Sequence, residues 1–238
     1  MKILLTGSDG FIGSNLKNTD YHFHCLDIKS GKDLMTCELP DVDVVIHLAG
    51  LSGVRESLDY PTDYWINNVI VSQRIFERYK DKRILYASSS TAYEPWKNPY
   101  AMSKYSMEQI APENSVGMRF TTVYGPGAKK DMLIPRILRN DVPFINVNHK
   151  RDFIHVDDVI SAMLILLHNE YKGIIDIGTG ISNKLTDILE RVGIETKGAI
   201  GNDTERFDNK ADTTLLNSYS WKSSIDLFDY ILQNKVVN

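Results

Sequence analysis

Short apolar runs alternate along the chain with segments whose apolar residues recur at helical spacing. The runs read "KILLTG", "FHCLDI", "DVVIHLAG", "RILYASSS", "VGMRF" and "GIIDIG", and each has the length of a buried strand. Helical patterns lie between them, most clearly over residues 64–79 and 100–110. Buried strands separated by helices indicate a parallel sheet that is covered on both faces. The pattern predicts an α/β fold with a Rossmann-type, doubly wound parallel sheet.

Beyond "VYGPG" at residues 123–127 this regular alternation weakens. Helical patterns cover residues 132–139 and 157–168, and a later helix is predicted to begin near Ser182–Asn183, which are good capping residues. The last amphipathic run follows Ser223 and Ser224, either of which suits an N-cap. We expect these carboxy-terminal pieces to form a small lobe over the carboxyl edge of the sheet, where open α/β sheets bind ligands.

Composition narrows the functional class. The 238 residues are 42% hydrophobic and 24% charged with a net charge of −4, which is ordinary for a globular protein and gives no reason to expect nucleic acid as a partner. Cys25 and Cys37 form no CxxC pair, and no His/Cys/Asp cluster has metal spacing, so we predict reduced thiols and no metal. The amino-terminal apolar run breaks at glycine, and "AMLILL" is too short to cross a bilayer. We expect a cytoplasmic protein with no membrane partner.

Glycines occur at every third position directly after the first predicted strand, in "TGSDGFIG". Gly7, Gly10 and Gly13 would let the backbone turn tightly and approach a pyrophosphate. Asp27 closes the second predicted strand, where a carboxylate binds ribose hydroxyls and repels a 2′-phosphate. A glycine pattern alone is weak evidence, but the two features together predict a dinucleotide site for NAD. Asp33–Leu34 is expected to flank the adenine.

A tyrosine and a lysine four residues apart lie in "YEPWKNPYAMSK". On a helix that starts at Pro99, Tyr100 and Lys104 would share one face. A free tyrosine has a pKa of about 10, so we expect the ammonium and an oxidised nicotinamide to lower it for a role as a base. The strand end "ASSSTAY" supplies hydroxyl groups beside this helix. The pair with its hydroxyl predicts a catalytic site.

At this point the sequence resembles the extended short-chain dehydrogenases/reductases, in the group of nucleotide-sugar epimerases and dehydratases. The resemblance also includes "HLAG", "NNVIV", "RFTTVYGPG", "RDFIHVDDV" and "IDIGTG", in order. It implies a catalytic Ser89 beside Tyr100 and Lys104, tightly held NAD, and a sugar substrate carried on a nucleoside diphosphate. Further implied NAD contacts are Phe11, Ile12, Leu48, Ala49 and Asn68. It implies an NAD-binding domain over residues 1–126, to which 151–180 partly return, and a substrate-binding lobe over 127–238.

Three blocks resemble the UDP-glucuronate 4-epimerases in particular. They are "LAGLSGVRESLDYP", "GMRFTTVYGPGAKKDM" and "RDFIHVDDV". The resemblance implies substrate contacts at Arg55, at Thr122, at Lys129 near the sugar carboxylate, and at Arg151 on the UDP phosphates. Substrate contacts are also expected at Ser90 and Thr91, which stand where the 4,6-dehydratases carry an acid pair that expels water. Two hydroxyl groups cannot replace that pair, so a dehydratase is disfavoured.

Two departures from the subgroup concern the substrate. Lys129 stands where the subgroup has arginine, so the charge is kept while the bidentate fork is lost. The interval between Tyr93 and Tyr100 is shorter than in the family, which predicts a pocket that is more open or is completed by another subunit. Arg206 is a candidate for the second phosphate-binding arginine.

These features together predict an NAD-dependent epimerase that inverts C4 of a UDP-sugar through a transient 4-keto intermediate. UDP-glucuronate, giving UDP-galacturonate, is the favoured substrate. UDP-glucose or a UDP-N-acetylhexosamine stays open, as do a 4-keto-sugar reductase and a non-catalytic NAD-binding module. The resemblance also implies a homodimer and a place in surface polysaccharide synthesis.

Overall fold

A six-stranded parallel sheet forms the centre of the computed structural model, which describes residues 1–235. Its strands lie in the order β2-β1-β3-β4-β5-β9. Their bounds are β1 (Ile3–Thr6), β2 (Phe23–Leu26), β3 (Val44–His47), β4 (Arg83–Ser89), β5 (Ser115–Phe120) and β9 (Gly173–Ile177). The order reverses between β1 and β3, which is where open α/β sheets bind ligands. The predicted α/β class and parallel sheet are confirmed.

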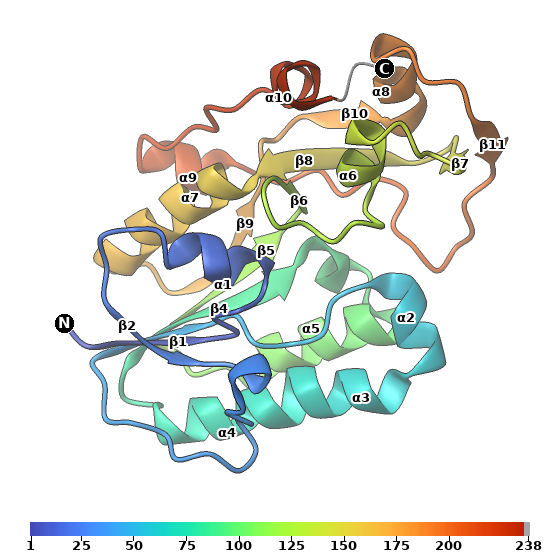
Figure 1. The fold of residues 1–238 in the computed structure, drawn as a ribbon. Coiled ribbons are helices and arrows are strands. Elements are labelled where there is room, and N and C mark those ends of the chain that lie inside the picture. Colours follow the sequence, from blue (N-terminus) through green and yellow to red (C-terminus); the bar gives the residue numbers. More distant parts are fainter. Residues whose placement is uncertain (236–238) are drawn as a thin grey trace.

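Helices cover both faces of this sheet (Figure 1). One face carries α1 (Phe11–Leu16) and α7 (Val156–His168), whose apolar side chains pack against β1, β3 and β4. The other face carries α4 (Val71–Arg78) and α5 (Pro99–Gln109). Because β1 and β3 are buried on both faces, they read as continuous apolar runs, whereas the edge strand β2 exposes His24 and Cys25.

The helical segment before α4 contains a local irregularity. A first helix, α3 (Pro61–Trp65), continues through a π-helical turn at Ile66–Ile70 into α4. The helix predicted over 64–79 therefore starts earlier, at a proline that suits the first helical position. Phe76 and Tyr79 of this segment are buried, whereas Trp65 is 45% exposed.

The carboxy-terminal part builds a lobe with its own apolar core. A three-stranded sheet, β10-β8-β6, and a two-stranded sheet, β11-β7, support three helices there (Figure 1). The strands are β6 (Thr122–Tyr124), β7 (Phe144–Asn146), β8 (Lys150–His155), β10 (Ser182–Lys184) and β11 (Lys197–Ala199). The lobe's helices are α6 (Leu133–Leu138), α8 (Leu185–Arg191) and α10 (Leu227–Asn234). The short helices α2 (Val54–Asp59) and α9 (Thr214–Ser218) lie beside α5 and β9.

Two predicted helix starts in this region were wrong. Ser182 and Asn183 belong to β10, which pairs antiparallel with β8, and α8 begins only at Leu185. Asp226 caps α10 by accepting hydrogen bonds from Phe228 N and Asp229 N, while Ser224 donates to Asp158. Strand pairing decided the first case, since α8 follows β10 from Lys184 without a side-chain cap. In the second case Asp226 caps the helix in place of a serine with similar capping preference.

The predicted division into 1–126 and 127–238 stays a prediction. Residues 156–177 supply α7 and β9 to the central sheet layers, while the rest of the later chain builds mainly the lobe. The last three residues of the predicted lobe, 236–238, lie outside the described residues.

Candidate functional site

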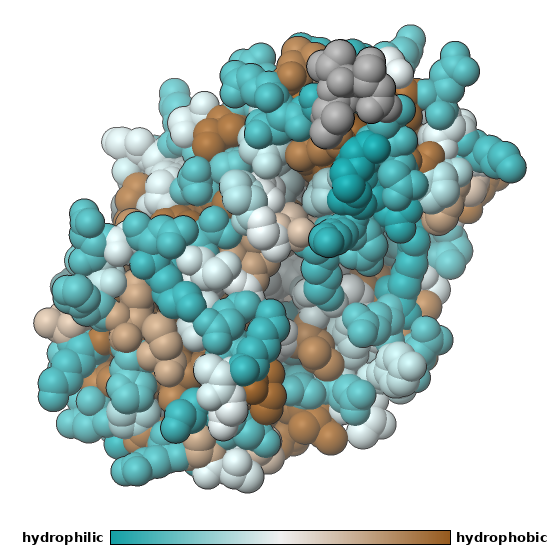
Figure 2. Space-filling view, viewed as in Figure 1, coloured by the Kyte–Doolittle hydropathy of each residue, from teal (hydrophilic) through white to brown (hydrophobic). Residues whose placement is uncertain are grey.

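A cavity of about 1240 Å³ lies between the carboxyl edge of the sheet and the lobe. The space-filling view shows the hollow between these two parts (Figure 2). Binding sites for single small molecules measure about 300–1,000 Å³, so this cavity has room for two ligands side by side. Most of the predicted cofactor residues line it, and the part around the glycine loop is termed its cofactor end; all of the predicted substrate residues line it too.

The glycine loop after β1 forms the floor of the cofactor end. Gly7 has a φ of +69°, and a Cβ there would lie 2.6 Å from Ala49 N. A Cβ on Gly13 would lie 2.3 Å from Gly7 O. Since neither position accepts a side chain, the loop stays tight and leaves its backbone open to a ligand. Gly10, Phe11 and Ile12 line the same cavity.

Asp27 follows β2 and is buried beside this loop. Its carboxylate accepts hydrogen bonds from Asp9 N and Lys29 N, both at 2.9 Å. A carboxylate has about four acceptor positions, so Asp27 fixes the loop and keeps capacity for ribose hydroxyls. Asp33, Leu34, Leu48 and Ala49 also line the cavity.

Asn68, by contrast, lies outside the cavity lining. Its side chain is buried in the π-helical turn, where Oδ1 accepts from Leu51 N (2.7 Å) and Nδ2 donates to Leu51 O (3.0 Å) and Ser103 Oγ (2.9 Å). Asn68 thus holds the loop after β3 in place, and its neighbour Asn67 lines the cavity. The role predicted for Asn68 stays a prediction.

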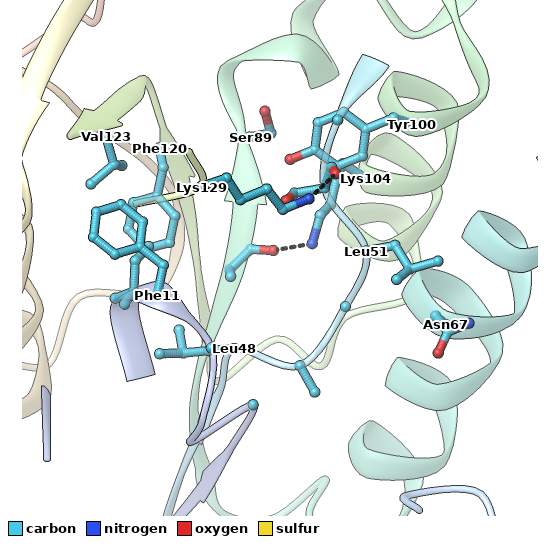
Figure 3. A pocket seen from close by; sticks show the side chains of 18 of the residues that line it. Phe11, Leu48, Leu51, Asn67, Ser89, Tyr100, Lys104, Phe120, Val123 and Lys129 are labelled. Atoms are coloured by element: carbon cyan, nitrogen blue, oxygen red, sulfur yellow. Dashed lines mark hydrogen bonds between the residues drawn. The ribbon is translucent and has the colours of Figure 1, made fainter. Parts of the chain in front are cut away.

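Ser89, Tyr100 and Lys104 come together at the centre of the cavity (Figure 3). Ser89 ends β4, and its Oγ accepts hydrogen bonds from Thr91 N (3.2 Å) and Thr91 Oγ1 (2.9 Å). Tyr100 opens α5, which Asn98 caps by accepting from Ala101 N. Lys104 follows one turn later on the same face.

The pKa of Tyr100 is not lowered by the protein alone, in contrast to what the tyrosine–lysine spacing led us to expect. Burial raises the pKa of Tyr100, and the hydrogen bond with Ser89 opposes that rise. Burial also lowers the pKa of Lys104 to about 8, and Lys104 Nζ donates to Ala87 O at 2.7 Å. The protein alone therefore does not lower the tyrosine pKa. The phenolate loses more hydration free energy on burial than the hydrogen bond with Ser89 restores.

His47, at the end of β3, is held in place by hydrogen bonds on both ring nitrogens. Its Nδ1 is 2.7 Å from Thr6 Oγ1, and its Nε2 is 2.9 Å from Ser72 Oγ. Burial and then the charge of Lys104 lower the His47 pKa to about 3, so the ring stays neutral.

All six predicted substrate residues line the cavity. They are Arg55, Ser90, Thr91, Thr122, Lys129 and Arg151. Lys129 reaches from the lobe across the cleft, donating to Ser52 O at 3.2 Å, and extends in front of Tyr100 and Lys104 (Figure 3). Thr122 Oγ1 accepts a hydrogen bond from Asn209 Nδ2 at 3.0 Å.

A carboxylate that the sequence did not single out lies among the basic residues. Glu205 Oε2 is 2.9 Å from Arg151 Nη2, and Oε1 is 3.5 Å from Arg55 Nε. Arg206 pairs in turn with Glu94 at 3.2 Å, and its Nη1 donates to Ser90 O. Glu205 and Asn209 both line the cavity, and no motif marks either one, since only the folded chain brings residues 205–209 to the cleft.

The shortened interval before Tyr100 forms one turn, Pro95–Lys97, that packs against the same late segment. Lys97 Nζ donates to Asp203 O, and Asn98 Nδ2 donates to Thr204 O. The segment around 203–206 thus borders the cleft where the interval is short.

Two features are absent from residues 1–235. None of their helices combines the length and apolar character needed to cross a bilayer. Within the same range, no group of three or more His, Cys, Asp or Glu side chains is arranged to hold a metal ion.

Comparison with known proteins agrees with this geometry. A family model described as "NAD dependent epimerase/dehydratase family" matches residues 3–178. A UDP-glucuronate 4-epimerase of Thermodesulfobacterium geofontis is 30% identical over 74% of this chain and 65% of its own length. A putative UDP-glucose 4-epimerase of Methanocaldococcus jannaschii is 29% identical over 99% of this chain and 97% of its own. MoeE5, solved with UDP-glucuronic acid and NAD, is 26% identical with a TM-score of 0.86, covering 98% of this chain and 97% of MoeE5.

Proposed function

The chain belongs to the NAD-dependent epimerase/dehydratase family, and we propose that it inverts C4 of a UDP-sugar, with UDP-glucuronate as its substrate. The observation that carries the proposal is the meeting of Ser89, Tyr100 and Lys104 at the centre of one cavity. The glycine loop and the basic residues Arg151 and Lys129 line the same cavity.

The cofactor end fits NAD. The cradle at Gly7 and Gly13 admits no Cβ, which suits close approach by a pyrophosphate. Asp27 presents a buried carboxylate at the end of β2, which favours two free ribose hydroxyls over a 2′-phosphate. When bound, NAD supplies the chemistry of accepting a hydride from sugar C4 and returning it.

The side chains of the chain handle the proton at the same centre. Tyr100 removes the proton from the sugar 4-hydroxyl and returns it when the configuration has been inverted. Ser89 holds the sugar oxygen, and Lys104 supplies the positive charge that favours the phenolate. The sugar must present its opposite face before the hydride returns, and an open cavity of about 1240 Å³ gives it space to turn.

Three observations favour an acidic sugar and an epimerisation. Lys129 places a cation in the cleft in front of Tyr100, where the carboxylate of a glucuronate would meet it (Figure 3). Ser90 and Thr91 line the cavity next to Ser89 and offer no carboxyl group for expelling water. The UDP-glucuronate 4-epimerase of T. geofontis is among the relatives at 30% identity.

A neutral UDP-hexose is the second candidate. MoeE5 has also been solved with UDP-glucose and NAD, and the putative UDP-glucose 4-epimerase of M. jannaschii matches nearly the whole chain. A lone lysine, unlike an arginine fork, makes no bidentate contact with a carboxylate. A direct comparison of the two sugars decides between the candidates.

The proposal extends to a homodimer. Apolar side chains are exposed side by side on α2, α3, the π-helical turn and α5, which are neighbours in the fold. They are Leu58, Tyr60, Trp65, Ile66, Ile70, Met102 and Tyr105. Contiguous exposed apolar surface of this kind favours burial against a second copy. Analytical ultracentrifugation tests it: we expect a dimer that Trp65→Glu converts to monomer, and a monomeric wild type contradicts the idea.

The decisive experiment supplies UDP-glucuronate with NAD in catalytic amount and separates the products. We expect UDP-galacturonate without accumulation of NADH, and none with Tyr100→Phe. If only UDP-glucose is turned over, the substrate is a neutral hexose and not UDP-glucuronate. Stoichiometric consumption of reduced cofactor on a 4-keto sugar would point to a reductase, and absence of turnover on every UDP-hexose would leave a binding module.

A further inference from the structure

Glu108 lies one turn beyond Lys104 on α5, and its side chain is 1% exposed. Its two oxygens accept a bidentate pair of hydrogen bonds from Arg119, with Nε–Oε1 at 2.8 Å and Nη2–Oε2 at 2.6 Å. Ser88 Oγ donates to Oε1 as well. Three hydrogen bonds from two residues therefore fix the carboxylate against the strand that ends at Ser89.

This network is anchored on both sides. Arg119 pairs in register with Ser88 across β4 and β5, and its guanidinium lies 4.1 Å from the centre of the Tyr93 ring. Tyr93 in turn donates to Asp176 at 3.0 Å. Glu108 thus belongs to a continuous polar network that ends beside the catalytic serine.

Stability alone gives little reason for a buried ion pair here. Replacing such a pair with apolar residues of similar volume is often neutral or stabilising, because two charges no longer have to leave water. Apolar residues in place of the pair would, however, leave the helix face that carries Lys104 without a negative charge. Residues four apart on a helix are neighbours, so the side chain of Glu108 lies next to that of Lys104.

The other charged and titratable groups near Lys104 give it no counter-charge, and Lys129, which extends in front of it from the lobe, is a second cation. From α5, Tyr100 is protonated at neutral pH because burial raises its pKa. From β3, His47 is neutral. From β5, Arg119 is cationic and already paired with Glu108. Burial lowers the pKa of Lys104, and Glu108 opposes that lowering.

We propose that Glu108 is a positioning residue of the catalytic centre, which keeps Lys104 charged and, through Ser88, fixes the end of β4 that carries Ser89. This inference rests on the proposed function, in which Lys104 must be a cation to favour the Tyr100 phenolate.

The test uses a double variant, Glu108→Leu with Arg119→Met, in the full chain. It removes both charges and leaves no orphaned ion, and the introduced methionine side chain would keep an apolar contact with Tyr93. Asp158→Asn is the matched control, because Asp158 is a buried carboxylate on α7 that accepts hydrogen bonds from Ser224 and Ile225. The primary readout is the titration of Lys104, followed by NMR of ¹³C-labelled lysine and assigned with Lys104→Met.

We expect Lys104 in the double variant to titrate at least one pH unit below its wild-type value, and the control to leave it in place. On the favoured substrate, kcat at pH 7 should fall at least about twofold with little change in KM, because a Lys104 pKa lowered from about 8 to about 7 leaves only half of the lysines charged. The alkaline limb of kcat should move to lower pH by the same shift. An unchanged Lys104 titration in the folded double variant overturns the inference. If the wild type turns over no UDP-sugar, the proposed function fails while the titration still decides the role of Glu108.

Should the double variant not fold, Glu108→Gln alone answers the same question. It keeps the shape and one acceptor while it removes the charge, so a merely structural role predicts an unmoved Lys104 titration. A downward shift in this variant supports the proposal, and an unmoved titration contradicts it.

Discussion

Lys104 Nζ donates a 2.7 Å hydrogen bond to the carbonyl oxygen of Ala87, inside a site where the lysine is almost fully buried. This carbonyl orients the ammonium group beside Tyr100 but does not neutralise it. Burial lowers the Lys104 pKa from 10.5 to about 8, which corresponds to about 3 kcal/mol of unfavourable free energy when the group is charged. The buried charge of Lys104 thus lowers the stability of the fold.

Replacement of Lys104 by methionine should stabilise the protein at neutral pH. The unfolded chain binds this proton more tightly than the folded one, so the cost is present in full below pH 8 and disappears as pH rises toward 10.5. After loss of a hydrogen bond worth about 1 kcal/mol, we expect a gain of about 2 kcal/mol at pH 7 and none near pH 10. Urea unfolding at both pH values measures it, with the exposed Lys172→Met as control. A gain independent of pH contradicts the explanation.

Tyr100→Phe should abolish turnover while leaving the fold intact. The phenol group is the base in the proposed mechanism, and loss of a general base costs about 10²–10⁴-fold in rate. We expect this fall in kcat, with NAD and UDP binding and the melting temperature near wild type. Tyr105→Phe, on the same helix and facing outward, is the control and should keep full activity. Retention of more than a tenth of wild-type kcat by Tyr100→Phe would remove the tyrosine from the mechanism.

Asp27→Asn tests the choice of cofactor. The substitution preserves shape, removes the charge that opposes a 2′-phosphate and weakens the tie to Asp9 N. Lys29 and Lys32 line the same end and would remain to attract that phosphate. We expect the affinity for NAD to fall about tenfold. The ratio of the affinities for NAD and NADP should fall by more than tenfold. Fluorescence titration with both cofactors measures it, and the exposed Asp20→Asn should change neither.

Apolar runs and glycine spacing were sufficient to predict the layers that carry the site. The six runs became the six strands of the central sheet. For the inner strands the reason is that a strand buried on both faces has little alternative to a continuous apolar sequence. The glycine loop and the α5 pair follow from local geometry, since both involve residues close in sequence.

These sequence patterns could not predict which distant segments pair with each other. Ser182 and Asn183 carry the signature of a helix cap, yet they form β10 because β8 offers them a ladder from residues 150–152. Glu205 and Asn209 lie in a stretch with no regular pattern, and only the folded lobe brings them to Arg151 and Thr122. The raised pKa of Tyr100 likewise follows from burial, which depends on the packed lobe and loops as much as on the helix itself.

Glu205 forms an ion pair with Arg151, and a nucleoside diphosphate that bound Arg151 would have to break this pair. Its carboxylate pairs with Arg151 at 2.9 Å and lies 3.5 Å from Arg55, so it competes for the charges that would meet the phosphates. Glu205→Gln should therefore bind UDP about three- to tenfold more tightly by isothermal titration calorimetry. The exposed Glu195→Gln should leave the affinity unchanged. Weaker binding by Glu205→Gln would mean that the glutamate orients Arg151 for the ligand and does not compete with it.

Lys129 is expected to set the preference between an acidic and a neutral sugar. Its ammonium group reaches across the cleft to Ser52 O in front of Tyr100, and a charge-assisted hydrogen bond to a sugar carboxylate would be worth about 1.5–3 kcal/mol. Lys129→Met should therefore lower kcat/KM for UDP-glucuronate by about 10- to 100-fold and leave that for UDP-glucose within about twofold. Lys129→Arg should retain the preference, because the guanidinium offers a fork that matches a carboxylate.

The adjacent Lys130 provides the control for this comparison. It is exposed, is absent from the lining of the large cavity and lines a small groove together with residues 125–128, so Lys130→Met should change neither substrate's kcat/KM. An equal loss on both sugars in Lys129→Met would show that Lys129 holds the cleft together through Ser52 without reading the sugar. A loss confined to UDP-glucuronate would place the carboxylate against Lys129, since no other change distinguishes the two substrates at C6.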